Sequence, residues 1–423
     1  MNLQAVKKAT ADITIKDRDT LRALASRVRA IADLPVMAER KRLWYAHNAC
    51  KSERPMVLAF PEGAWGEMLT DSDCTCEDKL LRGWELSLRR KIYWFEHIND
   101  DNTIEPTFEI GWCVSQGGYG VDIKRTHGEN RGSFTWEPPL KDLSNDLKKL
   151  HTREITVDRE RTFSLLDLAQ SIFGDILTPR IQGGFWWSLG LTNDAIQLVG
   201  IEGLMLTMYD NPGGLHALMS FLRDDRLNAL SYLEREELLT INNENGYTGS
   251  GGVAYTHELP QKDNPSGTPV RMKDLWGFAE SQETVGVSPE MFAEFILPYQ
   301  VPLLEKFGLN CYGCCEPVDK RLKYILPIKN MRRISISPWS DQESCAEQMG
   351  NRYVFSRKPN PAMICAQFNE DEIRADIRRT LSIASECNLE IIMKDTHTVM
   401  HEPERITRWI KIVREEIECN SAR

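Results

Sequence analysis

Short β-prone runs alternate with helical stretches through the second half of the chain, and this order constrains the fold most. Each run is followed by a longer stretch whose apolar residues recur at helical spacing. The strand candidates are 275–280, 309–314, 333–337, 353–356 and 389–393, and the following helices are expected from Ser288, Asp319, Gln342, Glu370 and Pro403. Five such units in succession imply parallel strands joined by helical crossovers.

The first half of the chain is less regular but completes the strand count. Its strand candidates are 56–60, 108–114 and 183–188, and its main helical stretches are 76–97 and 212–239. Eight strands predict an α/β fold, a single (β/α)8 barrel of the TIM type. An open doubly wound sheet is the alternative architecture, but no Gly-rich phosphate fingerprint follows a strand, and the run 249–252 is only a weak signal.

Two segments are expected to lie outside the regular barrel. Residues 1–50 are predicted to form a helical extension, and residues 51–423 would form the barrel itself. The apolar positions that recur at helical spacing in the extension are Leu21, Leu24, Val28 and Ile31. The segment 117–150 is polar and rich in turn residues, so it is expected to be an elaborated loop.

Composition excludes several classes of protein. The net charge of -10 argues against nucleic acid as the main partner. No apolar run reaches the length of about 18 residues that a membrane span requires, and the N-terminus lacks a signal-peptide apolar block. The 11 cysteines are odd in number and irregular in spacing, unlike a disulfide framework. A reducing cytoplasm is therefore expected, with thiols that are free, metal-bound or buried.

The segment 311–316 holds three thiols and a carboxylate at the end of a predicted strand. Thiolates beside a carboxylate are typical of zinc sites, and barrel enzymes keep their sites where strands end. Strand alternation places Cys311 and Cys314 on opposite faces, so if Cys314 faces the barrel mouth, Cys311 is expected to face the helices. Cys314 is then the best single ligand candidate. The structural alternative is that these cysteines simply fill a core.

Residues at other strand ends would share this mouth. Trp186, Trp187, Trp339 and Asn360 are the candidates for substrate binding, with the tryptophans forming an apolar wall. Candidates for orienting or protonating the substrate are Glu280, His257 and Lys394. His397 follows the last predicted strand and is a candidate metal ligand or acid/base group. Each tryptophan is nearly as well explained as ordinary core, and His397 as a hydrogen-bonded structural residue.

At these residues the chain resembles the uroporphyrinogen decarboxylase superfamily. The matching pieces are 288–292, 297–299, 313–317 and 358–361, with their order and spacing, and the resemblance covers roughly residues 180–415. That superfamily includes cofactor-free decarboxylases of tetrapyrrole acetate side chains. It also includes methyltransferases that act with a corrinoid cofactor and hold zinc through a His-x-Cys pair and a distant Cys.

The resemblance is closer to the methyltransferase branch, because Cys314 falls where that pair places its Cys. Tyr312 stands where the family has His, and the late ligand region offers His397 in place of a Cys. The resemblance therefore implies Zn²⁺ held by a reshuffled set, namely Cys314, Glu316, His397 and Cys311, or a lost metal. The decarboxylases share an Arg-rich N-terminal motif, whereas this chain has Glu62 and Glu67 in that region.

The resemblance thus implies a zinc-assisted methyltransferase that moves a methyl group between a small methylated compound of the O-methyl type and a corrinoid (cobalamin). The corrinoid would belong to a separate protein, because the chain has no Asp-x-His-x-x-Gly signature. One alternative is a metal-free decarboxylase using Glu280 and Glu62. Another is a non-catalytic binder of a tetrapyrrole or corrinoid. The sequence leaves open whether the chain forms a homodimer.

Overall fold

One strand from the first half of the chain and five strands from the second half form a six-stranded parallel sheet. The computed structural model describes residues 3–4, 13–127 and 134–421. In spatial order the strands are β1 (Met56–Ala59), β14 (Asn388–Met393), β13 (Val354–Arg357), β12 (Met331–Ile336), β11 (Leu309–Tyr312) and β10 (Trp276–Ala279). All neighbours pair in parallel, so their carboxyl ends meet at one edge. The parallel sheet confirms the predicted α/β class.

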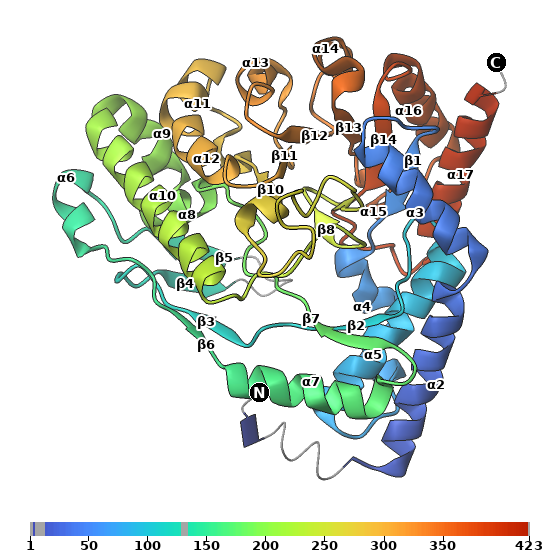
Figure 1. Cartoon of the computed structure of the whole chain (residues 1–423). Helices are drawn as coiled ribbons and strands as arrows, with labels where there is room; N and C mark the ends of the chain where they lie inside the picture. The colour runs from blue at the N-terminus through green and yellow to red at the C-terminus, as the bar shows by residue number, and fades with distance from the viewer. Residues whose placement is uncertain (1–2, 5–12, 128–133, 422–423) are drawn as a thin grey trace.

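Helices cover the outer side of this sheet (Figure 1). They are α11 (Pro289–Phe295), α12 (Leu297–Leu304), α13 (Leu322–Ile325), α14 (Gln342–Met349), α15 (Ala362–Cys365), α16 (Glu370–Ile383) and α17 (Glu404–Ser421). Side-chain caps mark the first residues of α11 and α16. The Ser288 hydroxyl accepts from the Met291 N–H, and the Asn369 side-chain oxygen accepts from the N–H groups of Asp371 and Glu372. Strand residues facing these helices, such as Tyr312, Ile334 and Ile391, share one buried apolar core with them.

The concave side of the sheet is filled by two other segments. One is α3 (Pro35–Asn48), and the other is the hairpin of β8 (Tyr247–Thr248) and β9 (Gly252–Val253). Their apolar side chains pack with Met56, Leu58 and Ile392 of the sheet. The hairpin fits because it is Gly-rich: a Cβ on Gly252 would lie 2.5 Å from the Arg333 guanidinium carbon.

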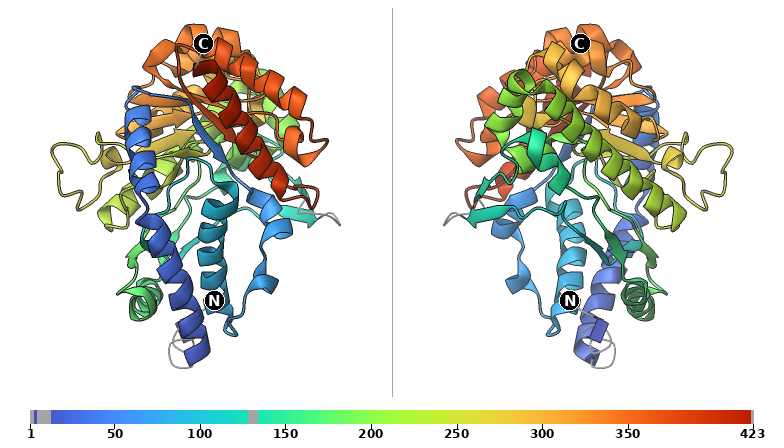
Figure 2. Two further views of the ribbon diagram at one scale, coloured as in Figure 1. Left: turned by 90° about the vertical axis from the view of Figure 1, so that its right-hand side faces the viewer. Right: turned by 90° about the vertical axis from the view of Figure 1, so that its left-hand side faces the viewer.

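The first half of the chain builds a second, smaller parallel sheet of β2 (Thr107–Ile110) and β7 (Thr178–Ile181). It packs with α2 (Ile15–Ala32), α5 (Lys79–Tyr93) and α7 (Arg159–Phe173) around a separate apolar core. Figure 2 shows this part beneath the six-stranded sheet. Leu21, Val28 and Ile31 of the predicted extension are buried in that core, and Leu24 packs against it. Division at residue 50 into extension and barrel stays a prediction.

The predicted loop 117–150 contains short elements of its own. Within it, β4 (Lys124–His127) pairs antiparallel with β5 (Phe134–Glu137). A second antiparallel pair, β3 (Val114–Gln116) with β6 (Ile155–Val157), flanks the segment. Residues 128–133 of this segment lie outside the described ranges. The helices that follow β5 and β7 are α6 (Leu143–Asp146), α8 (Thr192–Val199), α9 (Ile201–Asp210) and α10 (Pro212–Arg235). The predicted helices at 76–97 and 212–239 therefore exist with shorter bounds.

The predicted strand at 183–188 is wrong. The strand that pairs with β2 is Thr178–Ile181, which contains Pro179, and Gly183 and Gly184 then leave the ladder. Proline is tolerated because the sheet has only two strands, so every strand has a free edge. Among the described residues no ladder joins the two parallel sheets, and closure into one barrel stays a prediction. None of the described helices combines the length and apolarity needed to cross a membrane.

Candidate functional site

A small cavity lies at the carboxyl ends of β11, β12, β13 and β14, and we call it the thiol cavity. Its volume is about 130 Å³. It is lined by Ser250, Cys314, Cys315, Pro338, Trp339, Lys358, Pro359, Asn360, Pro361, Lys394 and Asp395. Two thiols, two lysines and one carboxylate therefore face the same small volume, at the edge of a parallel sheet where catalytic groups are usually found.

Cys314 reaches this cavity because the chain turns at Gly313. Cys311 lies on the concave side of the sheet, with its Sγ 3.8 Å from the Arg333 Nη1 and 3.8 Å from the Thr248 Oγ1. Tyr312 points to the helices, where its hydroxyl donates to the Gln300 Oε1 at 2.6 Å. Gly313 has φ +90°, a conformation that glycine adopts without strain. The prediction that Cys311 faces the helices is therefore wrong.

The surroundings of Cys314 favour its thiolate form. The Cys315 thiol lies 3.7 Å from the Cys314 Sγ, and the Ser250 hydroxyl donates to the same sulfur at 3.4 Å. The hydrogen bond from Cys315 has the largest effect and lowers the pKa of Cys314. The hydrogen bond from Ser250 and the positive charge of Lys394 lower it further, although burial opposes ionisation. The pKa of Cys315 is raised in turn, since it is the donor of the pair. Of the two thiols in the cavity, Cys314 is thus the one whose thiolate form the surroundings favour.

The two lysines of the thiol cavity differ in protonation. Burial lowers the pKa of Lys358 from its ordinary 10.5 to about 7, aided by the charges of Lys394 and Arg333. Burial also opposes the charge on Lys394, but Tyr247, Glu62 and Cys314 outweigh it and raise its pKa. The Lys394 Nζ lies 3.6 Å from the Glu62 Oε1. The cavity therefore holds a permanent positive charge beside an amine that exchanges protons near neutral pH.

Competitive acylation should separate these two amines. We expect Lys358 to react with acetic anhydride along a titration curve centred near pH 7, whereas Lys394 stays unreactive well above that pH. Peptide mass spectrometry across a pH series measures the titration curves of both lysines. The unfolded chain keeps the Lys358 proton up to about pH 10.5, so the contribution of Lys358 to the free energy of unfolding increases as pH rises from about 7 to 10.5. Equal titration of the two lysines would contradict the assignment.

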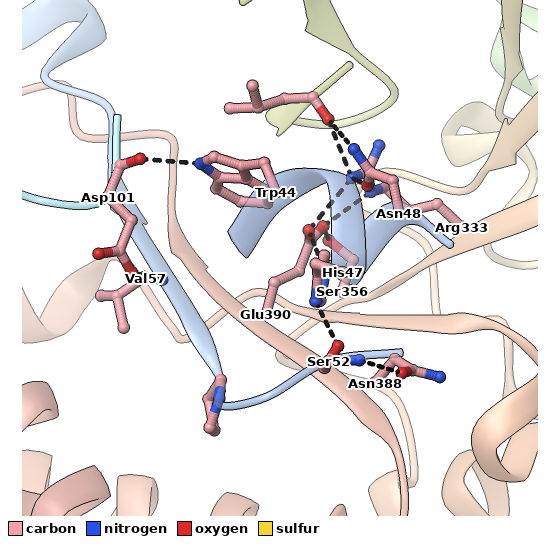
Figure 3. A network of polar contacts seen from close by, with 12 residues as sticks. Trp44, His47, Asn48, Ser52, Val57, Asp101, Arg333, Ser356, Asn388 and Glu390 are labelled. Carbon is pink, nitrogen blue, oxygen red and sulfur yellow. Dashed lines mark hydrogen bonds and ion pairs between the residues drawn. The ribbon is translucent and has the colours of Figure 1, made fainter. Parts of the chain in front are cut away.

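A chain of buried polar groups connects Lys358 to the opposite end of the sheet. The Lys358 Nζ hydrogen-bonds the Ser356 hydroxyl, which donates to the Glu390 Oε1. The Glu390 Oε2 lies 3.0 Å from the His47 Nε2, and the His47 Nδ1 lies 2.7 Å from the Ser52 hydroxyl. Figure 3 shows Ser356, Glu390, His47 and Ser52 in this arrangement. Because burial lowers the pKa of His47, the neutral ring donates from Nε2 to the carboxylate.

Arg333 supplies the positive charge that balances Glu390 in this hydrogen-bonded network. Its Nε lies 2.9 Å from the Glu390 Oε1, and its Nη2 donates to the Asn48 Oδ1 at 2.6 Å. Both partners of the ion pair are fully buried, at 1% and 0% exposure for Arg333 and Glu390. Burial opposes ionisation of Glu390, but Arg333 and His47 outweigh it and hold its pKa well below the usual range. The network thus positions Ser356, and through it Lys358.

Two larger cavities lie on the other side of the β8–β9 hairpin. The first, the tryptophan cavity of about 440 Å³, is lined by Trp186, Trp187, Tyr247 and Phe278, among others. The second, which we call the aromatic cleft, has a volume of about 510 Å³ and lies between α5, β2, β7 and the segment 241–246. Residues 247–249 line the tryptophan cavity, and Ser250 of the same hairpin lines the thiol cavity. The aromatic cleft adjoins the tryptophan cavity, because Gln182, Asn242 and Gly246 line both.

The structure brings some predicted site residues together and leaves others apart. Lys394, Trp339, Asn360 and Cys314 line the thiol cavity, whereas Trp186 and Trp187 line the tryptophan cavity. The exposed His257 stacks on Tyr45 of α3 at 3.9 Å. It precedes Glu258, which pairs with Arg332 near the start of β12, so His257 lies at the opposite end of the sheet.

Glu280 lies in the protein interior rather than in a cavity. Its Oε1 accepts from the Ser188 hydroxyl at 3.1 Å, and its side chain packs against Gly190. Burial, followed by the charges of Glu283 and Glu316, raises the pKa of Glu280 well above its ordinary value. Glu280 is therefore a buried carboxyl group near the end of β10 whose surroundings disfavour its charged form.

The four predicted zinc ligands do not converge on one point. Cys311 lies beside the Arg333 guanidinium, and His397 packs against Gly63. Both Glu316 carboxylate oxygens accept backbone N–H groups, from Ser281 at 2.8 Å and from Cys314 at 2.9 Å. Within residues 3–4, 13–127 and 134–421, no three His, Cys, Asp or Glu side chains are grouped to hold a metal. The predicted set of four residues therefore does not fit Zn²⁺.

Sequence reasoning missed Ser250, Lys358 and Asp395 of the thiol cavity as functional candidates. It included Cys315 in the thiol-rich segment 311–316 but did not single it out. Lys358 stands directly after β13 in the segment 358–361, so its position at a strand end was a usable signal. Its lowered pKa depends on burial and on neighbours from other strands, which no local pattern encodes. Ser250 lies in the Gly-rich run 249–252, whose role as a filling hairpin is visible only in three dimensions.

No protein-family model matches the sequence, and no curated protein matches it either. Among solved structures, the chain is similar to a methyltransferase from Methanosarcina mazei, with a TM-score of 0.48 and 12% sequence identity. The similarity covers 88% of this chain and 97% of that one.

Proposed function

We propose that the protein is a methyltransferase that moves a methyl group between a small methylated compound and a corrinoid protein, with Cys314 as the reacting thiol. The observation that carries the proposal is the thiol cavity itself. It places Cys314, whose pKa is lowered, beside the charged Lys394 and the exchangeable Lys358. The ordered motifs that resemble methyltransferases add support.

The chemistry of the first half-reaction follows from these groups. The Cys314 thiolate attacks the methyl carbon of an O-methyl donor, so that a sulfur–carbon bond forms as the carbon–oxygen bond breaks. The bonding pair goes to the departing oxygen, and the ammonium form of Lys358 delivers a proton to it. Lys394 stays charged and holds Cys314 as the thiolate. The methyl group then passes from Cys314 to an external nucleophile, which regenerates the thiolate.

The external nucleophile is the corrinoid of the partner protein, which supplies a strongly nucleophilic metal centre when it is bound. Two exposed tryptophans that line the cavities are the residues that would contact the corrinoid. Trp339 lines the thiol cavity and is 69% exposed, and Trp187 lines the tryptophan cavity and is 48% exposed. Exposed tryptophans beside a cavity suit contact with a large conjugated ring.

The test uses free cobalamin, reduced to Co(I), and a panel of trideuteromethyl ethers under anaerobic conditions. The proposal expects donor-dependent formation of methylcobalamin by absorbance. It also expects the trideuteromethyl group on the peptide containing Cys314 when cobalamin is left out. A panel that gives neither methylated cobalamin nor methylated Cys314 would overturn the proposal. Labelling of an exposed thiol such as Cys419 alone would also count against it.

A second candidate, a metal-free decarboxylase, is favoured by the pair of lysines. An amine with a pKa near 7 condenses with a ketone, and a neighbouring ammonium binds a carboxylate. For a 3-keto acid, Lys358 would form an iminium with loss of water. Carbon dioxide would then leave, with its bonding electrons passing to the iminium. Borohydride reduction with acetoacetate should then attach the substrate to Lys358, and an unmodified Lys358 would exclude this route.

A further inference from the structure

We propose that the aromatic cleft is a binding site for a planar aromatic or conjugated molecule that carries one carboxylate. The site is separate from the thiol cavity, and the inference is independent of the proposed methyl transfer. The cleft has a volume of about 510 Å³, which lies within the range of roughly 300–1,000 Å³ typical of small-molecule pockets. Its walls combine aromatic surfaces with one guanidinium that, within the part of the chain that the structure describes, pairs with no carboxylate.

The aromatic wall consists of residues after β1 and on α5. Phe60 and Trp65 follow β1, and Trp94 stands at the end of α5. The Phe60 and Trp94 rings lie 5.4 Å apart, and the Trp65 and Trp94 rings lie 6.2 Å apart. The Trp94 Nε1 donates to the Asp100 Oδ1 at 3.0 Å, which fixes this ring. Three held rings offer stacking surface at little cost in side-chain entropy.

Most charged residues that line the cleft neutralise one another. Lys91 pairs with Glu109 at 2.9 Å, and Arg180 pairs with Glu244 at 2.6 Å. Glu105 pairs with Lys41 of α3 at 2.7 Å. These three pairs account for every carboxylate on the cleft wall.

Arg90 is the exception. Among the described residues it has no ion pair with a carboxylate, and its Nη2 donates only to the Leu69 carbonyl oxygen at 3.1 Å. Its Nε is buried without a hydrogen-bond partner in the same part of the chain. The guanidinium carbon lies 5.1 Å from the Trp65 ring centre. Burial lowers the pKa of Arg90, which is the mark of a desolvated, unneutralised cation. An anion at this position would relieve that cost.

The ligand class follows from these two features. A carboxylate matches the fork of the Arg90 guanidinium. The Trp65 and Trp94 ring planes are inclined by 55°, so a flat body would stack on one of these two rings and contact the edge of the other. The cleft does not open directly on Cys314. Phe60 packs on Tyr247 at 5.4 Å, and the Tyr247 ring centre lies 5.6 Å from the Lys394 Nζ, which lines the thiol cavity. A ligand in the cleft would thus contact the side-chain layer next to the thiol cavity.

The test measures binding of 2-naphthoate, and of uncharged 2-naphthalenemethanol, by calorimetry and tryptophan quenching. We expect naphthoate to bind at least about tenfold more tightly than the alcohol. Arg90→Gln should remove that preference, whereas Arg90→Lys should keep part of it. The matched control is Arg89→Gln, since Arg89 pairs with Glu85 on the same helix and does not line the cleft. It should leave affinity unchanged.

Two results would overturn this inference. One is the absence of naphthoate binding at millimolar concentration to the wild-type chain. The other is equal affinity of the wild type and Arg90→Gln, with the variant's fold verified by circular dichroism. Neither result depends on methyl transfer, so failure of this site and failure of the proposed function can be told apart.

Discussion

Replacing Glu390 by glutamine is expected to lower the free energy of unfolding by about 3–5 kcal/mol, the usual cost of removing one partner of a buried ion pair. The change keeps the side-chain shape but leaves the Arg333 guanidinium without its counter-charge. The Asn48 amide oxygen and the Val253 carbonyl still accept from Arg333, but neither carries a full charge. Urea denaturation at neutral pH measures the loss.

The control for this variant is Glu386→Gln, since Glu386 is exposed in the segment before β14. It should change stability by less than about 0.5 kcal/mol. Glu390→Gln has a second effect, because the Glu390 carboxylate raises the pKa of Lys358. The acylation curve of Lys358 should therefore move to lower pH in the variant. A loss of stability below about 1 kcal/mol, with an unmoved curve, would show that the network does not act on the cavity.

Replacing Cys314 by serine is expected to reduce methyl transfer by about 10³-fold or more, as loss of a nucleophile does in other enzymes. The hydroxyl keeps nearly the same volume, but it is a far weaker nucleophile and does not ionise near neutral pH. Little change in stability is expected, because the Ser250 hydroxyl can hydrogen-bond the new oxygen. Initial rates with the best ether of the panel, over a range of pH, measure the effect.

Two further variants, Cys315→Ala and Cys419→Ser, distinguish a specific role of Cys314 from a general effect of removing a thiol. Without the Cys315 thiol, Cys314 loses the hydrogen bond that most favours its thiolate, so the pH–rate profile should shift to higher pH. Cys419 is an exposed thiol on α17, and its replacement should leave the rates unchanged. If Cys314→Ser retained more than about a tenth of the wild-type rate, the thiol would not be the reacting group.

The second half of the fold could be predicted because local signals agree with its packing. The caps at Ser288 and Asn369 mark α11 and α16, and each apolar strand of the six-stranded sheet is bounded by turn residues. The strand β7 could not be predicted, since Pro179 argues against a strand in any purely local reading. Its pairing with β2 is a long-range contact between distant segments.

The candidate site was predictable in position but not in its chemical details. Strand ends indicated Cys314, Lys394, Trp339 and Asn360 as candidates, and these four residues line one cavity, whereas their roles stay predictions. Their protonation states could not be read from the sequence, because the pKa of Lys358 is set by burial and by residues on other strands. The positive φ of Gly313 likewise overrides the alternation that a strand imposes, so both Cys311 and Cys314 lie on the concave side.

The pH dependence of Cys314 alkylation by iodoacetamide, followed by peptide mass spectrometry, tests whether the cavity favours the Cys314 thiolate. We expect half-maximal reactivity below the ordinary cysteine pKa, and a shift to higher pH in Lys394→Met. Cys345, whose pKa is raised by burial, serves as the internal unreactive thiol. A Cys314 that reacts no faster than Cys345 at neutral pH, or whose curve is unmoved in Lys394→Met, would contradict this expectation.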